Sequence, residues 1–190
     1  MKKSHIIIGI VVLALIGAGV FWFSPGVSIQ NSLFLIPHSA PPSAETELEP
    51  YVVPALGETY TNNEYGFSLT LPEGFSARTM SANALGSKTV VLEDGKGNGI
   101  QITVTPFDED VRALTQERIE RDVPDMEIKD PQTVEIGANH TGLAFVSDNP
   151  AFNGASREVW FVFRKQLYQV STYLRLDELL QTMFQTWKFE

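Results

Sequence analysis

The fold is decided by residues 157–174, REVWFVFRKQLYQVSTYL. Two segments within it, Arg157–Arg164 and Leu167–Leu174, are rich in aromatic and β-branched residues, which favour strands. Lys165 and Gln166 lie between these segments and leave room only for a tight reversal of the chain. The stretch therefore predicts two neighbouring antiparallel strands joined by a hairpin turn.

Segments on the amino-terminal side of this hairpin repeat the strand pattern with short connections. Tyr65–Leu71 alternates, and its Phe67, Leu69 and Leu71 share one face, which predicts a half-buried strand. The glycine-rich turn Asp94–Gly99 predicts a second hairpin. Further strands are expected at Phe75–Met80, Lys88–Glu93, Ile100–Thr105, Glu127–Lys129, Thr133–Ile136 and Gly142–Ser147.

Two helices are expected among these strands. The first covers Val111–Asp122 and follows three acids, Asp108–Asp110, which suit a helix amino terminus. Asp177 is expected to cap the second helix. Charge pairs on the first helix and apolar residues on one side of the second support them: Glu117/Arg121, Arg118/Asp122, Leu179, Leu180, Met183 and Phe184.

The order of these elements predicts the fold class. Strands, a helix, further strands and a second helix follow one another, with short connections between neighbouring strands. This order is typical of an α+β fold in which helices pack on an antiparallel sheet.

The amino-terminal part of the chain has the character of a membrane anchor. Ile6–Phe23, IIIGIVVLALIGAGVFWF, holds 18 uncharged residues, and as a helix it would be about 27 Å long, close to the thickness of the hydrocarbon core. Lys2 and Lys3 precede it, and the next basic residue is Arg78. This asymmetry predicts a single-pass membrane protein with a cytoplasmic amino terminus and an extracytoplasmic carboxy-terminal domain.

A cleaved secretory signal is the alternative interpretation of this stretch. The apolar run ends in the bulky Phe21–Phe23 instead of the small residues that signal peptidases favour, so the uncleaved anchor is preferred. We expect an anchor at residues 1–26, a Pro- and Glu-rich linker at 27–59 and an α+β domain at 60–190.

The charge balance restricts the partners. The chain has a net charge of −9, and the part from Tyr60 onward holds 12 Lys and Arg against 19 Asp and Glu, a balance of −7. Such a surface repels phosphate backbones, which disfavours nucleic acid as a partner. It also disfavours flat docking on anionic lipid. The chain has no cysteine, so thiol chemistry and a cysteine-linked lipid anchor are ruled out.

No residue in the sequence is assigned a catalytic role. Beyond the apolar run there are two histidines, His38 in the linker and His140, which is interpreted as a polar residue at a strand edge. Nucleophilic catalysis needs a nucleophile, a base and an orienting group, and no G-x-S-x-G motif occurs. Asn139-His140-Thr141 also matches a glycosylation sequon, a pattern that arises often by chance.

The acidic and glycine-rich turns do not predict a metal or a cofactor. Glu93 and Asp94, like Asp108–Asp110, are adjacent acids that turns and helix caps usually leave solvated. Asp94 could begin a calcium loop, but Lys96 and Thr105 occupy positions where that loop needs oxygen ligands. Gly86–Thr89 lacks the glycine and the following helix of a phosphate loop.

The aromatic residues of the carboxy-terminal strands are expected in the core. Trp160 is opposite in phase to Phe161 and Phe163, so the two sets face opposite sides of the sheet. One set faces the core by default, and the other is either covered by a helix or left as an interaction patch. Tyr168 and Tyr173 belong to the same aromatic group.

Three stretches, taken in order, resemble the PsbP-like family. They are YGFSLTLP at 65–72 with Gly74-Phe75, VVLED at 90–94 followed by Gly99–Thr105, and LYQV at 167–170 leading to FQTWKF at 184–189. The resemblance covers residues 60–190 and implies an α/β/α sandwich with a central antiparallel sheet. It also implies a non-enzymatic extracytoplasmic role in assisting a membrane protein assembly. The well-known members are peripheral proteins of photosystem II, whereas this chain has an expected membrane span of its own. It would therefore be a membrane-anchored, bacterial-type member.

Three functions are compatible with the sequence. The first is a membrane-tethered extracytoplasmic interaction or assembly module without catalytic activity, with an envelope or membrane protein as its partner. The second is a domain that binds a small ligand or a divalent metal through its acidic turns. The third is an extracytoplasmic hydrolase, which ranks last because no substrate can be named.

Overall fold

The computed structural model describes residues 51–190 except 81–85, 108, 110–113 and 153. The expected membrane span, the adjoining part of the linker, His38, Asp108 and Asp110 lie outside these residues. Within them, the structure contains no helix that is both long and apolar enough to cross a membrane.

Two antiparallel sheets form the domain. The smaller has three strands in the order β1-β2-β10, where β1 covers Leu56–Asn62, β2 Phe67–Pro72 and β10 Lys188–Phe189. The larger has seven strands in the order β3-β4-β5-β9-β8-β7-β6. Their bounds are Ser76–Met80 for β3, Lys88–Glu93 for β4, Gly99–Pro106 for β5, Lys129–Ile136 for β6, His140–Asn149 for β7, Gly154–Phe163 for β8 and Gln166–Tyr173 for β9.

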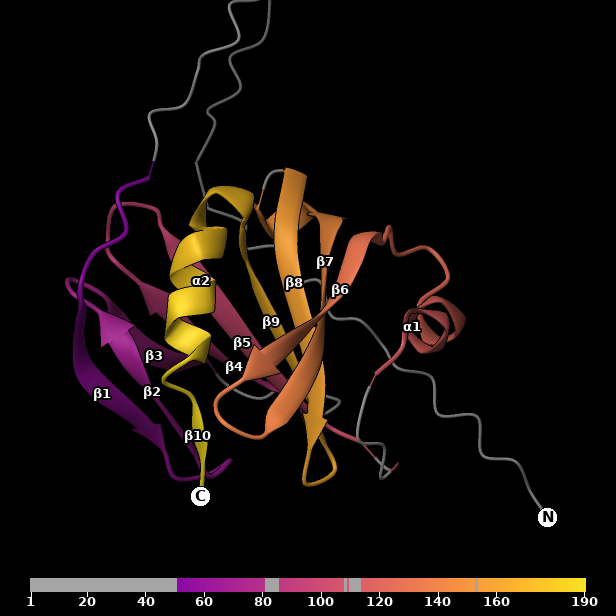
Figure 1. Cartoon of the computed structure of the whole chain (residues 1–190), viewed down its shortest axis with the longest axis horizontal. Coiled ribbons are helices and arrows are strands. Elements are labelled where there is room, and N and C mark those ends of the chain that lie inside the picture. Colours follow the sequence, from indigo (N-terminus) through magenta and orange to yellow (C-terminus); the bar gives the residue numbers. More distant parts are fainter. Residues whose placement is uncertain (1–50, 81–85, 108, 110–113, 153) are drawn as a thin grey trace, which may run out of the picture. The chain divides into compact units, whose positions relative to one another are not determined.

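Two short α-helices and two 3₁₀ turns complete the described residues. α1 covers Gln116–Asp122 and α2 Asp177–Phe184. The turn η1 covers Pro150–Phe152, and η2 covers Leu174–Leu176 immediately before α2. Figure 1 shows α2 between β1–β2 and β6–β8, whereas α1 lies at the far side of β6 and β7. The expected α+β class with antiparallel pairing is therefore found, although the strands form two sheets rather than one.

The hairpin that decided the fold is formed by β8 and β9. Its register pairs Phe161 with Tyr168 and Phe163 with Gln166. The turn residues are Arg164 and Lys165, one position earlier than expected, with φ angles of 46° and 58°. Positive φ at both central residues is the geometry that matches the twist of a two-residue hairpin.

The main core lies between one face of the larger sheet, the smaller sheet and α2. It contains Phe67, Leu69 and Leu71 of β2 and the expected apolar side of α2. β2 is more buried than the half-buried strand that the sequence predicts, since even Ser68 is only 7% exposed. The strand is central in the smaller sheet, so β1 and β10 flank it on both sides.

A second apolar cluster occupies the opposite face of the larger sheet. Trp160 and Val162 of β8 pack there with Phe145 and with Ile119 of α1. Phe161, in the opposite phase, belongs to the main core. The alternation expected for these aromatics is thus confirmed, and both faces of β8 are covered.

Two sequence-based expectations differ from the structure. β1 begins at Leu56, inside the expected linker, and Tyr51 and Val53 already pack against the main core. The predicted strand pieces at 127–129 and 133–136 are replaced by one strand, β6, which begins only at Lys129 and leaves Glu127 and Ile128 outside. It has a bulge between Lys129 and Gln132, where Pro131 interrupts the pairing.

The helix starts also differ from the expected ones. Thr115 caps α1, because its side chain accepts a hydrogen bond from the Arg118 amide, whereas Asp108 and Asp110 of the expected start lie outside the described residues. Asp177 is the first residue of α2 rather than its cap, and its carboxylate is engaged by Arg157. Of the two predicted charge pairs, Arg118–Asp122 forms, whereas Arg121 contacts Asp122 instead of Glu117.

Candidate functional site

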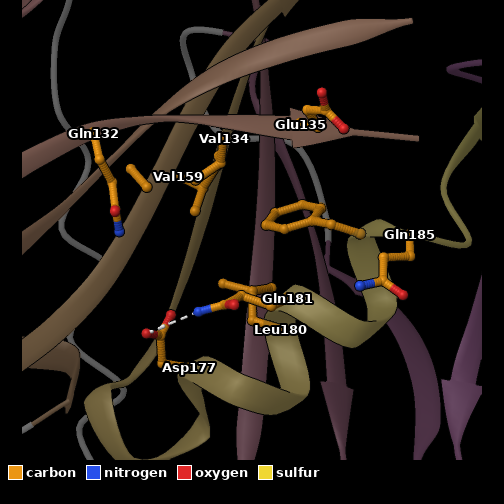
Figure 2. A pocket seen from close by; sticks show the side chains of 10 residues that line it. Gln132, Val134, Glu135, Val159, Asp177, Leu180, Gln181 and Gln185 are labelled. Atoms are coloured by element: carbon orange, nitrogen blue, oxygen red, sulfur yellow. Dashed lines mark hydrogen bonds between the residues drawn. The ribbon is translucent and has the colours of Figure 1, made fainter. Parts of the chain in front are cut away.

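A groove of about 350 Å³ lies between α2 and strands β6, β7 and β8. We call it the α2–β6 groove. Figure 2 shows Val134 and Val159 on the strand side of the groove and Leu180 and Gln181 on the helix side, with the Glu135 carboxylate directed away from α2. Its lining residues are Gln132, Val134, Glu135, Ala144, Val159, Asp177, Leu180, Gln181, Phe184 and Gln185.

The walls of the groove are apolar because the strands and α2 each turn apolar side chains toward it. Val134, Ala144 and Val159 come from three neighbouring strands. Leu180 and Phe184 are one helical turn apart on α2, so they face the sheet together. Val134 is the partly exposed member of the sheet wall, whereas Ala144 and Val159 are each 2% exposed.

The rim of the groove is polar and carries negative charge. Gln132, Gln181 and Gln185 supply amides, while Glu135 and Asp177 supply carboxylates. The Gln181 amide donates a hydrogen bond to Asp177 over 3.2 Å, drawn as a dashed line in Figure 2. Amides can donate and accept hydrogen bonds, so this rim is suited to peptide groups and to cations.

One end of the groove is fixed by an ion pair between β8 and α2. Arg157 Nε lies 3.0 Å from Asp177 Oδ1, and Nη2 donates to Oδ2 over 3.1 Å. The Nε contact lies within ion-pair distance but is not aligned as a hydrogen bond, so we treat it as electrostatic. The side chains are 11% and 28% exposed, so Asp177 keeps partial access to solvent.

A buried carboxyl group lies on the other face of β8. Glu158 is 1% exposed and receives contacts from Ser156, Ser171, Asn149 and Trp160. Burial raises the pKa of Glu158, and the four hydrogen bonds oppose that rise only in part. No pattern in the sequence distinguishes Glu158, because a glutamate in a strand ordinarily faces solvent.

The histidine considered in the sequence lies in an aromatic setting. The His140 ring packs edge-on against Phe163 at 4.8 Å and tilted against Phe189 at 4.5 Å between centroids. Partial burial lowers the pKa of His140. Asn139 of the sequon is exposed in the turn between β6 and β7.

The acidic turn at residues 94–99 is closed by its own side chains. Asp94 Oδ1 accepts hydrogen bonds from the backbone amides of Lys96 at 2.7 Å and Asn98 at 3.1 Å. Asp94 Oδ2 accepts one from the Asn98 side-chain amide at 2.5 Å. These bonds lower the pKa of Asp94, although partial burial acts in the opposite direction as the largest single influence. The carboxylate stabilises the hairpin turn that the glycines predicted.

The remaining candidates of the sequence analysis are dispersed over the fold. Glu93 pairs with Arg78 across β3 and β4 at 2.7 Å, and Glu109 pairs with Arg118. Gly86–Thr89 leads into strand β4. Among the described residues, no group of three or more His, Asp and Glu side chains is placed to hold a metal ion.

The comparisons with known proteins give a likeness of fold. No family model matches the chain, and no curated protein matches it. Among solved structures, the chain is similar to the solution structure of cyanobacterial PsbP from Synechocystis sp. PCC 6803, with 10% identity and a TM-score of 0.48. The match covers 70% of this chain and 92% of that one.

Proposed function

We propose that this chain is a membrane-tethered extracytoplasmic interaction module that holds a segment of a membrane or envelope protein in the α2–β6 groove. It catalyses no reaction in this role. The observation that carries the proposal is the groove itself, with apolar walls and a rim of amides and carboxylates. The apolar run at Ile6–Phe23 supports the tether.

The chemistry of the groove defines the segment it would hold. Val134, Leu180 and Phe184 offer an apolar surface for one aliphatic or aromatic side chain. Glu135 and Asp177 on the rim favour a neighbouring Lys or Arg. The balance of −7 from Tyr60 onward adds attraction for a basic partner. The preferred occupant is therefore an apolar residue flanked by basic residues in a partner protein.

Site-directed cross-linking tests this contact, since the chain has no cysteine of its own. Gln132→Cys and Gln185→Cys place a reactive thiol at the groove rim in the full-length, detergent-solubilised protein, and Lys96→Cys places one in the exposed turn between β4 and β5. We expect both rim variants to cross-link the same partner through a peptide with apolar and basic residues. Lys96→Cys should not capture that peptide.

A second variant shows whether the groove itself is required. Val134→Arg, at a partly exposed position, puts a long cationic side chain into the groove and should abolish the cross-link from both rim positions. Equal capture from Lys96→Cys, recovery of the chain alone, or capture that survives Val134→Arg would contradict the proposal.

The tether has its own test. Lys96→Cys should react with a membrane-impermeant maleimide in intact cells, and the full-length protein should stay in the membrane pellet after alkaline carbonate extraction. Labelling only after lysis would place the domain in the cytoplasm. Release by carbonate would show that the chain is not anchored through residues 6–23.

A small ligand is the second candidate occupant, because a volume of about 350 Å³ falls within the range of roughly 300–1,000 Å³ found for small-molecule sites. Calorimetry with an amphipathic amine, compared between the natural chain and Val134→Arg, separates the two cases. Heat that disappears with Val134→Arg, in the absence of any cross-linked partner, would favour the small ligand.

A further inference from the structure

Glu158 is a buried acid without a cationic partner among the described residues. It lies in the middle of β8, opposite Phe145 on β7 and Ser171 on β9, and is 1% exposed. Arg157, its neighbour in sequence, points to the other face of the sheet and pairs with Asp177. A carboxylate in this place would be a charge removed from water without compensation by an opposite charge.

The hydrogen bonds around Glu158 can be satisfied together if one oxygen carries a proton. Oε2 accepts from the Ser171 hydroxyl at 2.5 Å and from the Trp160 indole at 3.4 Å. Oε1 accepts from the Asn149 amide at 3.1 Å and lies 2.7 Å from Ser156 Oγ.

The contacts of the Ser156 hydroxyl indicate which oxygen of Glu158 carries the proton. Its oxygen also lies 3.3 Å from the backbone carbonyl oxygen of Ser147. A hydroxyl has one proton to donate, so beside an ionised Glu158 it can serve only one of these two acceptors. If Glu158 Oε1 is protonated, it donates to Ser156, and Ser156 donates to Ser147. Every group in the cluster then has a partner.

The other titratable groups near this face do not supply a counter-charge. On β9 the titratable side chain on the same face as Ser171 is Tyr173, whose ring contacts Phe152 at 5.0 Å and the Arg175 guanidinium at 4.3 Å. On β7 the side chains facing Glu158 are Phe145, Ser147 and Asn149, with Asp148 on the opposite face of the strand.

α1 covers the same face of the sheet near Trp160, and its two cations, Arg118 and Arg121, are paired with acids. Arg118 contacts both Glu109 and Asp122, so this guanidinium is engaged by two carboxylates. Burial also raises the pKa of Glu158, which agrees with a proton on its Oε1 oxygen.

We propose that Glu158 is held as a neutral carboxylic acid in the folded domain and that its ionisation makes the stability of the domain depend on pH. The folded state binds this proton more tightly than the unfolded chain does. The resulting stabilisation is fully present below pH 4.5, the ordinary value for a glutamate, and is lost as the pH rises through the higher pKa of the folded state. Protonation of Glu158 thus stabilises the domain at low pH, and this stabilisation decreases as the pH rises.

Two measurements on the full chain test the proposal. Carbon-13 NMR of selectively labelled glutamate should show one carboxyl signal, assigned to Glu158 through its loss in Glu158→Gln, that still reports the protonated form when exposed glutamates have ionised. Thermal unfolding across the same pH series should show that Glu158→Gln removes a component of stability that falls with rising pH. Glu158→Gln loses the hydrogen bond from Asn149, so it should be less stable than the natural chain at acidic pH. The difference in stability between the two proteins should become smaller as the pH rises.

A matched control removes a charge of the same kind elsewhere. Glu73→Gln, at an exposed position next to β2, should leave the pH profile of the melting temperature unchanged. Ionisation of the Glu158 signal together with the exposed glutamates would overturn the proposal. So would parallel pH profiles for the natural chain and Glu158→Gln. The NMR titration uses the natural chain for its readout, so the proposal stays testable even if a variant folds poorly.

Discussion

Arg157 on β8 and Asp177 at the start of α2 join the larger sheet to the helix that forms one wall of the groove. Their closest atoms are 3.0 Å apart, and Asp177 also receives the Gln181 amide. The pair links the position of α2 to the strand that carries Val159, so it helps to set the width of the α2–β6 groove.

Loss of one partner should cost more than loss of both. Arg157→Met leaves Asp177 without its cation and should lower the free energy of unfolding by about 2 kcal/mol, below the cost for fully buried pairs because Asp177 is partly solvated. The double variant Arg157→Met/Asp177→Leu should recover part of that loss. Urea unfolding measures both, and a double variant less stable than Arg157→Met would contradict the interpretation.

Gly137 should be among the least replaceable residues of the domain. Its φ is +57°, its amide donates to the Phe184 carbonyl at 2.9 Å, and an added Cβ would lie 2.1 Å from the Trp187 carbonyl oxygen. Gly137→Ala combines backbone strain with a clash against main chain and should cost at least about 3 kcal/mol.

Gly74 is the matched control for that substitution. Its φ is +82°, but a Cβ would meet no atom within 4 Å. Gly74→Ala should therefore cost only the backbone strain, about 1 kcal/mol. Equal costs in chemical denaturation would show that the contact at Gly137 relaxes without penalty.

His140 should make the domain less stable as the pH falls into the acidic range. Its pKa is lowered in the folded domain, so the stabilisation is present above pH 6.5 and is lost as the pH falls through the lower pKa of the folded state. His140→Leu keeps an apolar side chain between Phe163 and Phe189 and should remove this loss of stability at acidic pH. Melting temperatures from neutral to acidic pH measure it, and an unchanged slope would refute the assignment.

The hydroxyl of Thr115 caps α1, and it shares the Arg118 amide with the Thr115 carbonyl oxygen, to which that amide also donates at 3.1 Å. Thr115 accepts a hydrogen bond from the Arg118 amide at 3.3 Å, so Thr115→Ala should destabilise the domain by about 1 kcal/mol, whereas Thr115→Ser should be nearly neutral. Hydrogen exchange at the Arg118 amide reports the cap directly. Equal acceleration in both variants would show that the hydroxyl does not act as the cap.

The sequence predicted the elements whose signals are local. β4 was expected at its observed bounds, because KTVVLE is a short apolar strand followed by a glycine-rich turn. β1 was missed, because LGETYTN is largely polar and lies at the edge of the smaller sheet, where one side faces no strand. β10 has only two residues, too few for any periodic signal.

The candidate site depends on features that are not local. Val134 and Leu180 are distant in sequence, and no pattern in either segment shows that they form opposite walls of one groove. Glu158 was overlooked for a related reason. Its polar partners lie on β7, β8 and β9, so the environment that keeps it buried exists only after these strands have paired.

The pairing of β10 with β2 has a consequence for biosynthesis. The smaller sheet joins a strand near the start of the described domain to Lys188 and Phe189. A ribosome that has not yet released these residues carries a chain whose smaller sheet is incomplete, with one side of β2 still unpaired. The smaller sheet is therefore the later of the two sheets that can be completed during synthesis, because every strand of the larger sheet precedes β10 in the sequence.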